Sequence, residues 1–416
     1  MPPYFVLPIT GPAVNFKSFN LNPTILANIE ALGYETPTPI QTQTIPAIMQ
    51  GKDVMGLAQT GTGKTAAFAL PIIERLLKGP RNMVRAVIIA PTRELAQQIH
   101  EAICELAQGT RLRSMTAYGG VNINPQIKSL AHGIEIVVAC PGRLLDHIQQ
   151  RTINLSKVEV LVLDEADQMF DMGFLPDILK ILRFLPKDRQ TLLFSATMPP
   201  AIHDLANKVL HDPLKVEIGH RAPATSVKQS LFPVPKHLKT ALLMQLLPLA
   251  QKESVLVFTR TKHTAKKVAQ KLHDAGFSAT SLQGNLSQNK RQLAMNGFRD
   301  GSLQILVATD IASRGIDVSS ISHVINYDIP STVEAYIHRI GRTGRAAKEG
   351  EAFTLITNED NAEVRAIERV LGKPITRCEL EGFDYSAPAP ARSMADNATF
   401  KRPQQRNRGR QRKDRE

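Results

Sequence analysis

The segment Ala58-Gln-Thr-Gly-Thr-Gly-Lys-Thr65 decides how the first half of this chain is interpreted. It fits the phosphate-loop pattern, a glycine-rich turn that leads into a helix, with Ala58 where the general form has Gly. Gly61 and Gly63 allow successive backbone N–H groups to face phosphate oxygens. Lys64 can reach the β- and γ-phosphates, and Thr65 can bind Mg²⁺. The segment therefore predicts a nucleoside triphosphate site, the alternative being a glycine-rich turn that matches by accident.

A second element lies 100 residues further on, where the apolar run Val160-Leu-Val-Leu163 is followed by Asp164 and Glu165. A buried strand that delivers carboxylates at its C-terminal end is where α/β folds carry their chemistry. Asp164 would hold Mg²⁺, and Glu165 would orient and deprotonate the attacking water. A strand that ends in Asp-Glu is usually structural, but together with the phosphate loop it favours catalysis.

Short β-branched runs alternate with helical patterns along most of the chain, which predicts parallel sheets covered by helices on both faces. Pro71, soon after Thr65, predicts a short or kinked helix behind the phosphate loop. Helical spacing marks two further helices, around Leu95–Leu106 and Ala265–Leu272. The strand candidates are Ala86–Ala90, Ile134–Ala139, Val158–Leu163, Thr191–Phe194, Val255–Phe258, Gln304–Ala308 and His323–Tyr327.

The alternation pauses after Ile218 in a polar stretch that contains three prolines, and we expect a domain boundary there. The predicted units are an N-terminal extension (1–15), a first α/β domain (16–218), a linker (219–228), a second α/β domain (229–371) and a C-terminal extension (372–416). Beyond Tyr385, Ala-Pro repeats lead into a Gln/Asn/Arg-rich tail without periodicity, for which we expect disorder.

Composition limits the cellular setting and the partners. The net charge of +13 over 416 residues favours a polyanionic partner. The last 17 residues contain eight Lys or Arg and two acidic residues. Three widely spaced cysteines form no CxxC pair, which suits a reducing compartment and excludes a disulfide framework. No apolar stretch approaches 18 residues, so we expect no membrane span. Residues 4–14 are fairly apolar, but no positive charge precedes them and Pro8 and Pro12 interrupt the run, so we expect no signal peptide and a cytoplasmic location.

Asp164-Glu-Ala-Asp167 is the signature of the DEAD-box helicases, and the chain from about Phe16 to Leu371 resembles that family in the order and spacing of many motifs. The compact core with a short basic tail is similar to the bacterial RhlE group. Cys140 departs from the usual Thr, and a thiol is a poorer hydrogen-bond partner than a hydroxyl, so no side-chain role is expected there. The other matching segments are Gly33–Gln41, Pro91–Ala96, Gly119-Gly120, Pro141–Arg143, Ser195–Thr197, Leu256–Thr261, Gln288–Arg291, Ala308–Asp310, Arg314–Asp317 and His338–Arg345.

The resemblance implies two tandem RecA-like domains and ATP with Mg²⁺ as nucleotide and metal. It implies catalytic roles for Lys64, Asp164, Glu165 and two arginine fingers, Arg342 and Arg345, from the second half. Thr65 and Asp164 would bind the metal. The residues that would relay between the ATP site and the RNA site are Asp167, Ser195, Thr197 and His338. The nucleotide-binding set comprises Phe16, Gln41, Thr60, Gly61, Thr62, Gly63, Lys64, Thr65, Asp317, Arg342 and Arg345. The RNA-binding set comprises Pro91, Thr92, Arg93, Gly120, Arg143, Thr259, Arg260, Gln288, Arg291, Thr309 and Arg314.

Chemistry supports part of this assignment independently. The Gln41 amide offers one donor and one acceptor, which match the N7 and N6 groups of adenine but not guanine O6. Phe16 could stack on the base, although ordinary core packing is the alternative. For Arg314 and Arg339, solvated or structural ion pairs are the alternative. The RNA elements are mainly backbone, Thr and Arg, which suits phosphate and sugar contacts and sequence-independent binding.

The favoured function is an ATP-dependent RNA helicase in which closure of the two halves bends RNA and separates short duplexes. An ATP-gated RNA clamp or annealing chaperone would contain the same core motifs. A DNA-directed motor is disfavoured by the DEAD sequence, and a small-molecule kinase leaves the second half unexplained. Ribosomal precursors and the RNA-decay machinery are partners that only the resemblance suggests.

Overall fold

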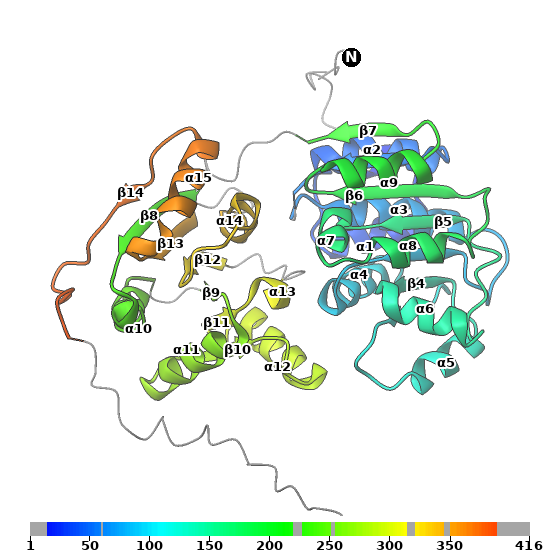
Figure 1. Ribbon diagram of the computed structural model, residues 1–416. Coiled ribbons are helices and arrows are strands. Elements are labelled where there is room, and N and C mark those ends of the chain that lie inside the picture. Colours follow the sequence, from blue (N-terminus) through cyan, green and yellow to red (C-terminus); the bar gives the residue numbers. More distant parts are fainter. Residues whose placement is uncertain are drawn as a thin grey trace, which may run out of the picture.

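Two seven-stranded parallel sheets form the framework of the protein in this computed structural model (Figure 1). The structure describes residues 15–59, 61–218, 227–250, 254–313, 321–344 and 350–388. We refer to the described residues up to Ile218 as lobe 1 and to those from Val227 onward as lobe 2.

The sheet of lobe 1 has the strand order β3-β4-β2-β5-β6-β1-β7. Its strands are β1 (Val54–Leu57), β2 (Ala86–Ile89), β3 (Ser114–Ala117), β4 (Ile136–Ala139), β5 (Val160–Leu163), β6 (Gln190–Ser195) and β7 (Leu214–Glu217). The helical segments are η1 (Phe16–Phe19), α1 (Pro23–Ala31), α2 (Pro39–Met49), α3 (Lys64–Leu76), α4 (Arg93–Leu106), α5 (Asn124–Ala131), α6 (Pro141–Gln149), α7 (Ala166–Asp171), α8 (Leu175–Leu182) and α9 (Pro200–Val209).

The sheet of lobe 2 has the strand order β10-β11-β9-β12-β13-β8-β14. Its strands are β8 (Val227–Pro233), β9 (Ser254–Phe258), β10 (Ala279–Leu282), β11 (Ile305–Ala308), β12 (Ile321–Asn326), β13 (Gly350–Ile356) and β14 (Thr376–Arg377). The helical segments are η3 (Lys236–Leu238), α10 (Lys239–Leu246), η4 (Leu247–Ala250), α11 (Lys262–Asp274), α12 (Gln288–Arg299), α13 (Asp310–Ser313), α14 (Val333–Ile340), η5 (Asn358–Asp360) and α15 (Asn361–Leu371).

Each sheet is buried on both faces, and several of its central strands, such as β2, β4, β5 and β11, are apolar at every position. In β5, Val160 and Val162 belong to one hydrophobic cluster, while Leu161 and Leu163 belong to the cluster on the other face. Alternation along a strand makes this division unavoidable. Since all strands within a sheet are parallel, their C-terminal ends lie along one edge. The two motif-bearing ends of β1 and β5 therefore lie on the same side of lobe 1.

The seven strand candidates all correspond to strands, with ends that differ by one or two residues. The two helices marked by periodicity are α4 and α11, and each begins after a Thr whose hydroxyl accepts a backbone N–H bond, from Leu95 and Thr264 respectively. The helix after the phosphate loop is not short: α3 has 13 residues and continues past Pro71. Its largely buried apolar side chains provide packing that outweighs the lost backbone bond.

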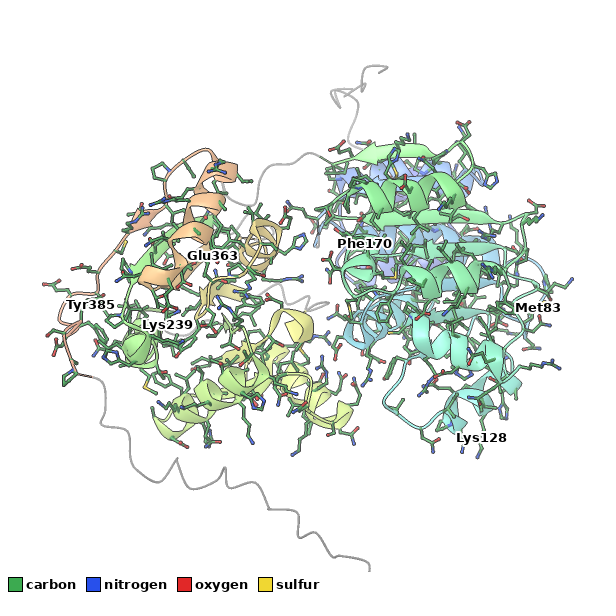
Figure 2. The ribbon with its side chains drawn as sticks, in the orientation of Figure 1. Met83, Lys128, Phe170, Lys239, Glu363 and Tyr385 are labelled. Carbon is green, nitrogen blue, oxygen red and sulfur yellow. The ribbon has the colours of Figure 1, made fainter. Side chains whose placement is uncertain are left out.

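Lobe 2 extends beyond the predicted domain bounds at both ends. β8 begins at Val227, inside the predicted linker, and β14 pairs with β8 after the predicted end of the domain. Cys378, Leu380, Phe383, Tyr385 and Ala387 then pack against the core of lobe 2. Tyr385 lies on the side of lobe 2 that faces away from lobe 1 (Figure 2). The predicted basic tail, the N-terminal extension up to residue 14 and most of the linker lie outside the described residues.

Among the described residues, no helix combines the length and apolar character needed to cross a membrane.

Candidate nucleotide and RNA sites

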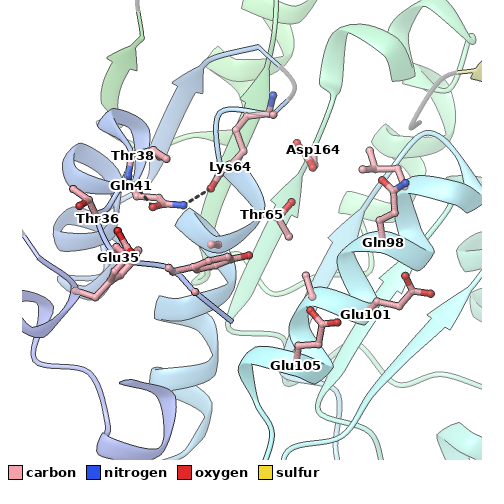
Figure 3. A pocket seen from close by; sticks show the side chains of 18 of the residues that line it. Glu35, Thr36, Thr38, Gln41, Lys64, Thr65, Gln98, Glu101, Glu105 and Asp164 are labelled. Carbon is pink, nitrogen blue, oxygen red and sulfur yellow. Dashed lines mark hydrogen bonds between the residues drawn. The ribbon is translucent and has the colours of Figure 1, made fainter. Parts of the chain in front are cut away.

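A cavity of about 560 Å³ lies at the C-terminal edge of the lobe 1 sheet, and residues of both lobes line it. Figure 3 shows the lobe 1 residues that surround it. Lobe 1 contributes the phosphate loop, the Gly33–Gln41 segment, α4 and the carboxylates after β5. Lobe 2 contributes Arg342, which is only 6% exposed. The cavity thus brings together Lys64, Thr65, Asp164, Glu165 and Arg342, which the sequence placed in one active site.

The phosphate loop leaves β1 and wraps around the ammonium group of Lys64. Lys64 Nζ donates hydrogen bonds to the carbonyl oxygens of Ala58 (2.7 Å) and Gln59 (2.9 Å). The Thr62 hydroxyl also donates to Gln59, at 2.7 Å. Gly61 and Gly63 have φ values of +81° and +88°, a conformation that favours glycine. The loop therefore holds a buried cation at the N-terminus of α3, which is an anion-binding arrangement. Thr60 lies outside the described residues.

The two carboxylates after β5 are buried and electrostatically coupled. Asp164 is 2% exposed and Glu165 is 4% exposed. Burial, followed by the charge of Asp164, raises the pKa of Glu165 to about 7, against the opposing effect of Arg342 and Lys64. Burial also raises the pKa of Asp164, which Lys64 opposes. A carboxylate with a pKa near 7 can serve as a general base at neutral pH.

Backbone geometry aims Glu165 into the cavity. Its φ of +52° is left-handed, and its backbone N–H donates to Asp164 Oδ1 at 2.9 Å. Within the described chain, the buried Glu165 Oε2 atom has no hydrogen-bond partner. An unsatisfied buried carboxylate oxygen is costly, and a hydrogen-bonded water at that position would satisfy it. The donor set fits Mg²⁺ as well, because Thr65 and Asp164 offer the few oxygen ligands that this ion takes alongside water and phosphate.

Three of the four residues predicted to relay between the ATP and RNA sites, Asp167, Ser195 and Thr197, form a compact network in lobe 1. Thr197 donates to Asp167 Oδ2 through its backbone N–H (2.9 Å) and its hydroxyl (2.8 Å). The Ser195 hydroxyl accepts from the backbone of Asp167 at 3.2 Å and donates to the carbonyl of Thr197 at 2.7 Å. These bonds join the end of β6 to α7. His338 lies on α14 of lobe 2.

The Gln41 amide is already hydrogen-bonded to protein. Its Oε1 accepts from the backbone N–H of Thr38 (2.9 Å), and its Nε2 donates to the Gly63 carbonyl (3.0 Å; Figure 3). A Cβ atom at Gly63 would lie 2.5 Å from this amide nitrogen. Each amide group keeps one further hydrogen-bonding position, so adenine recognition remains possible while Gln41 anchors the loop.

Phe16 lies mainly in the core. It is 5% exposed and packs edge-on against Phe19, with ring centroids 6.0 Å apart. It also lines the cavity together with Tyr34, whose ring centroid lies 6.3 Å away. Phe16 is therefore mainly a core side chain that also borders the cavity.

Three residues predicted to bind RNA make contacts across the lobes: Arg93, Gln288 and Arg291. Arg291 of lobe 2 pairs with Glu94 of lobe 1 at 2.7 Å, and the side chains are 12% and 7% exposed. Arg93 of lobe 1 donates to Gln288 Oε1 at 3.0 Å. Because each pair joins α4 to α12, these contacts tie the lobes together beside the nucleotide cavity.

A groove of about 490 Å³ adjoins these contacts and contains several predicted RNA residues, including Pro91, Thr92, Arg93, Arg143 and Arg291. The prediction that the Thr259 side chain contacts RNA is corrected. This side chain is fully buried, and its hydroxyl donates to the carbonyl of Thr261 at 3.3 Å. A buried hydroxyl cannot reach RNA directly. The groove also contains residues that the sequence prediction missed, because no motif or spacing marked them: Asp146, Met172, Phe174, Gly284 and Leu286.

The remaining predicted residues are distributed as follows. Gly120 lies on a loop before α5, Arg260 and Thr309 follow β9 and β11, and Arg314, Asp317 and Arg345 lie outside the described residues. Arg339 has a structural role, since it pairs with Asp310 at 2.6 Å and is 2% exposed. Cys140 precedes α6 without a side-chain capping bond, and burial raises its pKa to about 12.

Comparison with known proteins agrees with a two-lobed helicase. One family model, DEAD/DEAH box helicase, matches residues 38–205, and a second, helicase conserved C-terminal domain, matches residues 238–347. The DEAD-box ATP-dependent RNA helicase CshA of Bacillus subtilis is 43% identical over 372 residues, which cover 89% of this chain and 75% of that protein. The ATP-dependent RNA helicase CshA of Listeria monocytogenes is 45% identical over 370 residues, covering 89% and 71%. The chain therefore belongs to the DEAD-box ATP-dependent RNA helicases, which are ATP hydrolases.

Solved structures add information on the fold. Dbp5 of S. cerevisiae bound to RNA and ADP BeF3 gives a TM-score of 0.79 at 31% identity, covering 88% of this chain and 95% of that chain. A DEAD box protein from Methanococcus jannaschii gives only 0.52 at 41% identity, although 88% of this chain and 99% of that chain are covered. The prediction of two tandem RecA-like domains is confirmed.

Proposed function

We propose that this helicase hydrolyses ATP only when lobe 2 adds Arg342 to the phosphate-loop site of lobe 1, and that RNA binding along the adjoining groove favours this arrangement. The observation that carries the proposal is one cavity lined by Lys64, Glu165 and Arg342. A site divided between two bodies makes the nucleotide a switch between open and closed states. The TM-score of 0.79 against a neighbour bound to RNA and ADP BeF3 supports an arrangement of the lobes like that of the bound neighbour.

Within this site each side chain has a distinct task. Lys64 would bind the β- and γ-phosphates, and Glu165, with a pKa of about 7, would orient the attacking water and accept its proton. Arg342 would stabilise the charge that develops on the γ-phosphate. Thr65 and Asp164 would hold Mg²⁺, which when bound neutralises phosphate charge. We assign Arg345 a finger role, and Thr60 and Asp317 nucleotide contacts, on the resemblance alone.

RNA would follow the groove lined by Pro91, Thr92, Arg93 and Gly119 on lobe 1 and by Gly284 on lobe 2. These are backbone-rich and cationic elements, which suit phosphate and sugar contacts without base readout. A strand bent to fit both lobes cannot remain paired, so local strand separation would follow closure.

The finer biological setting is also a proposal. A cytoplasmic role in ribosome assembly or RNA decay follows from the resemblance, and a place in the RhlE-like group rests on the compact core and basic tail. For the domains we propose bounds of 16–218 and 229–371, and β8 and β14 favour a second domain that extends to both sides of that range.

The test uses the full chain with single-stranded RNA, single-stranded DNA of the same sequence, and short and long RNA duplexes. We expect RNA to stimulate ATP hydrolysis much more than DNA, and short duplexes to open with ATP. Equal stimulation by DNA would contradict the RNA assignment. ATP-dependent RNA retention without strand separation would favour the clamp instead.

A further inference from the structure

Two buried polar side chains of lobe 1 lie next to the RNA groove and have no task in the proposed mechanism. Gln126 on α5 is 8% exposed, and His147 on α6 is fully buried. Buried polar groups are costly unless their hydrogen bonds are satisfied. Each side chain is hydrogen-bonded through both of its polar atoms, and the partners of Gln126 lead to the loop that contains Gly119 and Gly120.

Gln126 is the centre of this network. Its Oε1 accepts from Arg143 Nη1 at 3.1 Å and from His147 Nε2 at 3.0 Å. Its Nε2 donates to the carbonyl of Tyr118 at 3.2 Å. Oε1 therefore faces two donors and Nε2 faces an acceptor, so the amide has one consistent orientation. We call Gln126, Arg143 and His147 the Gln126 network.

The ring of His147 matches this arrangement when it is neutral. Burial, followed by the charge of Arg143, lowers its pKa. With the proton on Nε2, the ring donates to Gln126, and Nδ1 accepts from the Thr152 hydroxyl at 2.7 Å. The ring is thus oriented from both sides, which restricts the rotamers of Gln126 in turn.

Arg143 closes the network on the other side of the glycine pair. Its Nη2 donates to the carbonyl of Val121 at 3.0 Å, and its Nε donates to Asp146 at 3.3 Å. The side chain is 9% exposed, and three of its five donors are used on protein. The carbonyls of Tyr118 and Val121, on either side of Gly119-Gly120, are therefore both held by the Gln126 network.

The shape of this loop affects the groove directly. Gly120 has a φ of +76°, and a Cβ atom there would collide with the guanidinium of Arg93. Arg93 in turn donates to Gln288 of lobe 2 at 3.0 Å. A change in the loop would therefore displace the Arg93 guanidinium, which lines the groove and contacts lobe 2.

We propose that Gln126 and His147 are positioning residues for RNA: through Arg143 and the carbonyls on both sides of Gly119-Gly120, they fix the loop in the shape that binds a phosphate. This inference rests on the proposed RNA groove. It assigns Arg143 mainly to holding the loop rather than to a free contact with the ligand.

The competing explanation is that the network only stabilises lobe 1. Gln190 provides a control, because it is a buried glutamine (5% exposed) at the N-terminal end of β6. The Gly119-Gly120 loop follows the C-terminal end of β3 and so lies at the other edge of the parallel sheet. Its Nε2 donates to the carbonyls of Ile48 (3.0 Å) and Lys52 (2.6 Å). Gln190→Leu therefore removes two buried bonds far from the loop, together with a buried Oε1 atom that has no hydrogen-bond partner within the described chain.

The experiment measures RNA affinity of the full chain by fluorescence anisotropy, the RNA concentration for half-maximal ATPase, kcat and thermal stability. We expect Gln126→Leu to weaken RNA affinity about tenfold, with a higher half-maximal RNA concentration and a nearly unchanged kcat at saturating RNA. Gln190→Leu should leave RNA affinity unchanged, and it should lower Tm less than Gln126→Leu, because an unpartnered buried oxygen is removed with the two bonds. His147→Phe should weaken RNA binding, and His147→Gln, which can still donate to Gln126, should recover most of it.

Equal RNA affinities for Gln126→Leu and Gln190→Leu would overturn the positioning role, as would His147→Gln binding no better than His147→Phe. If the unmodified chain showed no RNA stimulation at all, the proposed function itself would fail. The two failures are therefore distinguishable in one data set.

Discussion

Glu94→Gln is the substitution that examines lobe closure most selectively. Glu94 and Arg291 lie 2.7 Å apart, and their side chains are 7% and 12% exposed. Arg291 also donates to the carbonyl of Gln283 at 3.4 Å, so it would stay in place, without its counter-charge, when the carboxylate becomes an amide. Breaking a buried pair costs about 3–5 kcal/mol when one partner is deleted. Because glutamine keeps an acceptor oxygen, we expect the free energy of lobe closure to become less favourable by about 2 kcal/mol. This corresponds to a roughly 30-fold lower equilibrium constant for closure.

The same helix supplies the control. Glu101 pairs with Arg299 of lobe 2 at 3.7 Å, and these side chains are 43% and 29% exposed. An exposed pair at this distance is worth about 0–1 kcal/mol. Glu101→Gln makes the same change of charge on α4, so it should alter closure by about twofold or less.

The assay compares RNA affinity with and without a non-hydrolysable ATP analogue. Glu94→Gln should weaken RNA binding about 30-fold with the analogue, where closure is required, and much less without it. Simple electrostatics predicts the opposite sign, because removing a negative charge from the groove should strengthen binding to a polyanion. Tighter binding, or equal effects of Glu94→Gln and Glu101→Gln, would refute the reasoning.

Three further predictions concern the ATP site and the tail. Glu165→Gln should keep ATP and RNA binding but lose hydrolysis by about 10²–10⁴-fold in single-turnover assays; normal hydrolysis would remove Glu165 from the base role. Since the base must be ionised and its pKa is raised to about 7, kcat/KM for ATP should rise about tenfold per pH unit below that value and level off above it; a flat pH profile would argue against this. Truncation after Pro388, which spares the packed residues before it, should weaken RNA binding and flatten its salt dependence while sparing ATP affinity; an unchanged salt titration would contradict a tail contact.

Much of the framework follows from local sequence. The central strands β2, β4, β5 and β6 are buried at every position, and such strands read as continuous apolar runs. Seven strands of the described chain were not predicted: β1, β3, β7, β8, β10, β13 and β14. Of these, β7 and β14 are mostly exposed edge strands, whereas β13 is largely buried but contains Gly350, Glu351 and Thr354, which interrupt its apolar run. Edge strands are specified by pairing with a neighbour rather than by their own pattern.

The phosphate loop after β1 and the carboxylates after β5 were predictable because the residues of each motif are contiguous in the sequence. Contacts between distant segments were not. Glu94 and Arg291 are separated by 197 positions, and nothing local to either residue indicates the pair. The burial of Thr259 and the partners of Gln126 likewise depend on how whole elements pack, which no motif records.

The central claim is that lobe 2 supplies the cationic group that lobe 1 needs for turnover. Arg342→Ala measures this most directly, with RNA-stimulated ATPase and fluorescent-nucleotide binding followed on the full chain. Loss of an arginine finger costs about 10³–10⁵-fold in kcat, so turnover should nearly vanish while ATP affinity changes little. Turnover close to that of the unmodified chain would contradict a site completed from the second lobe.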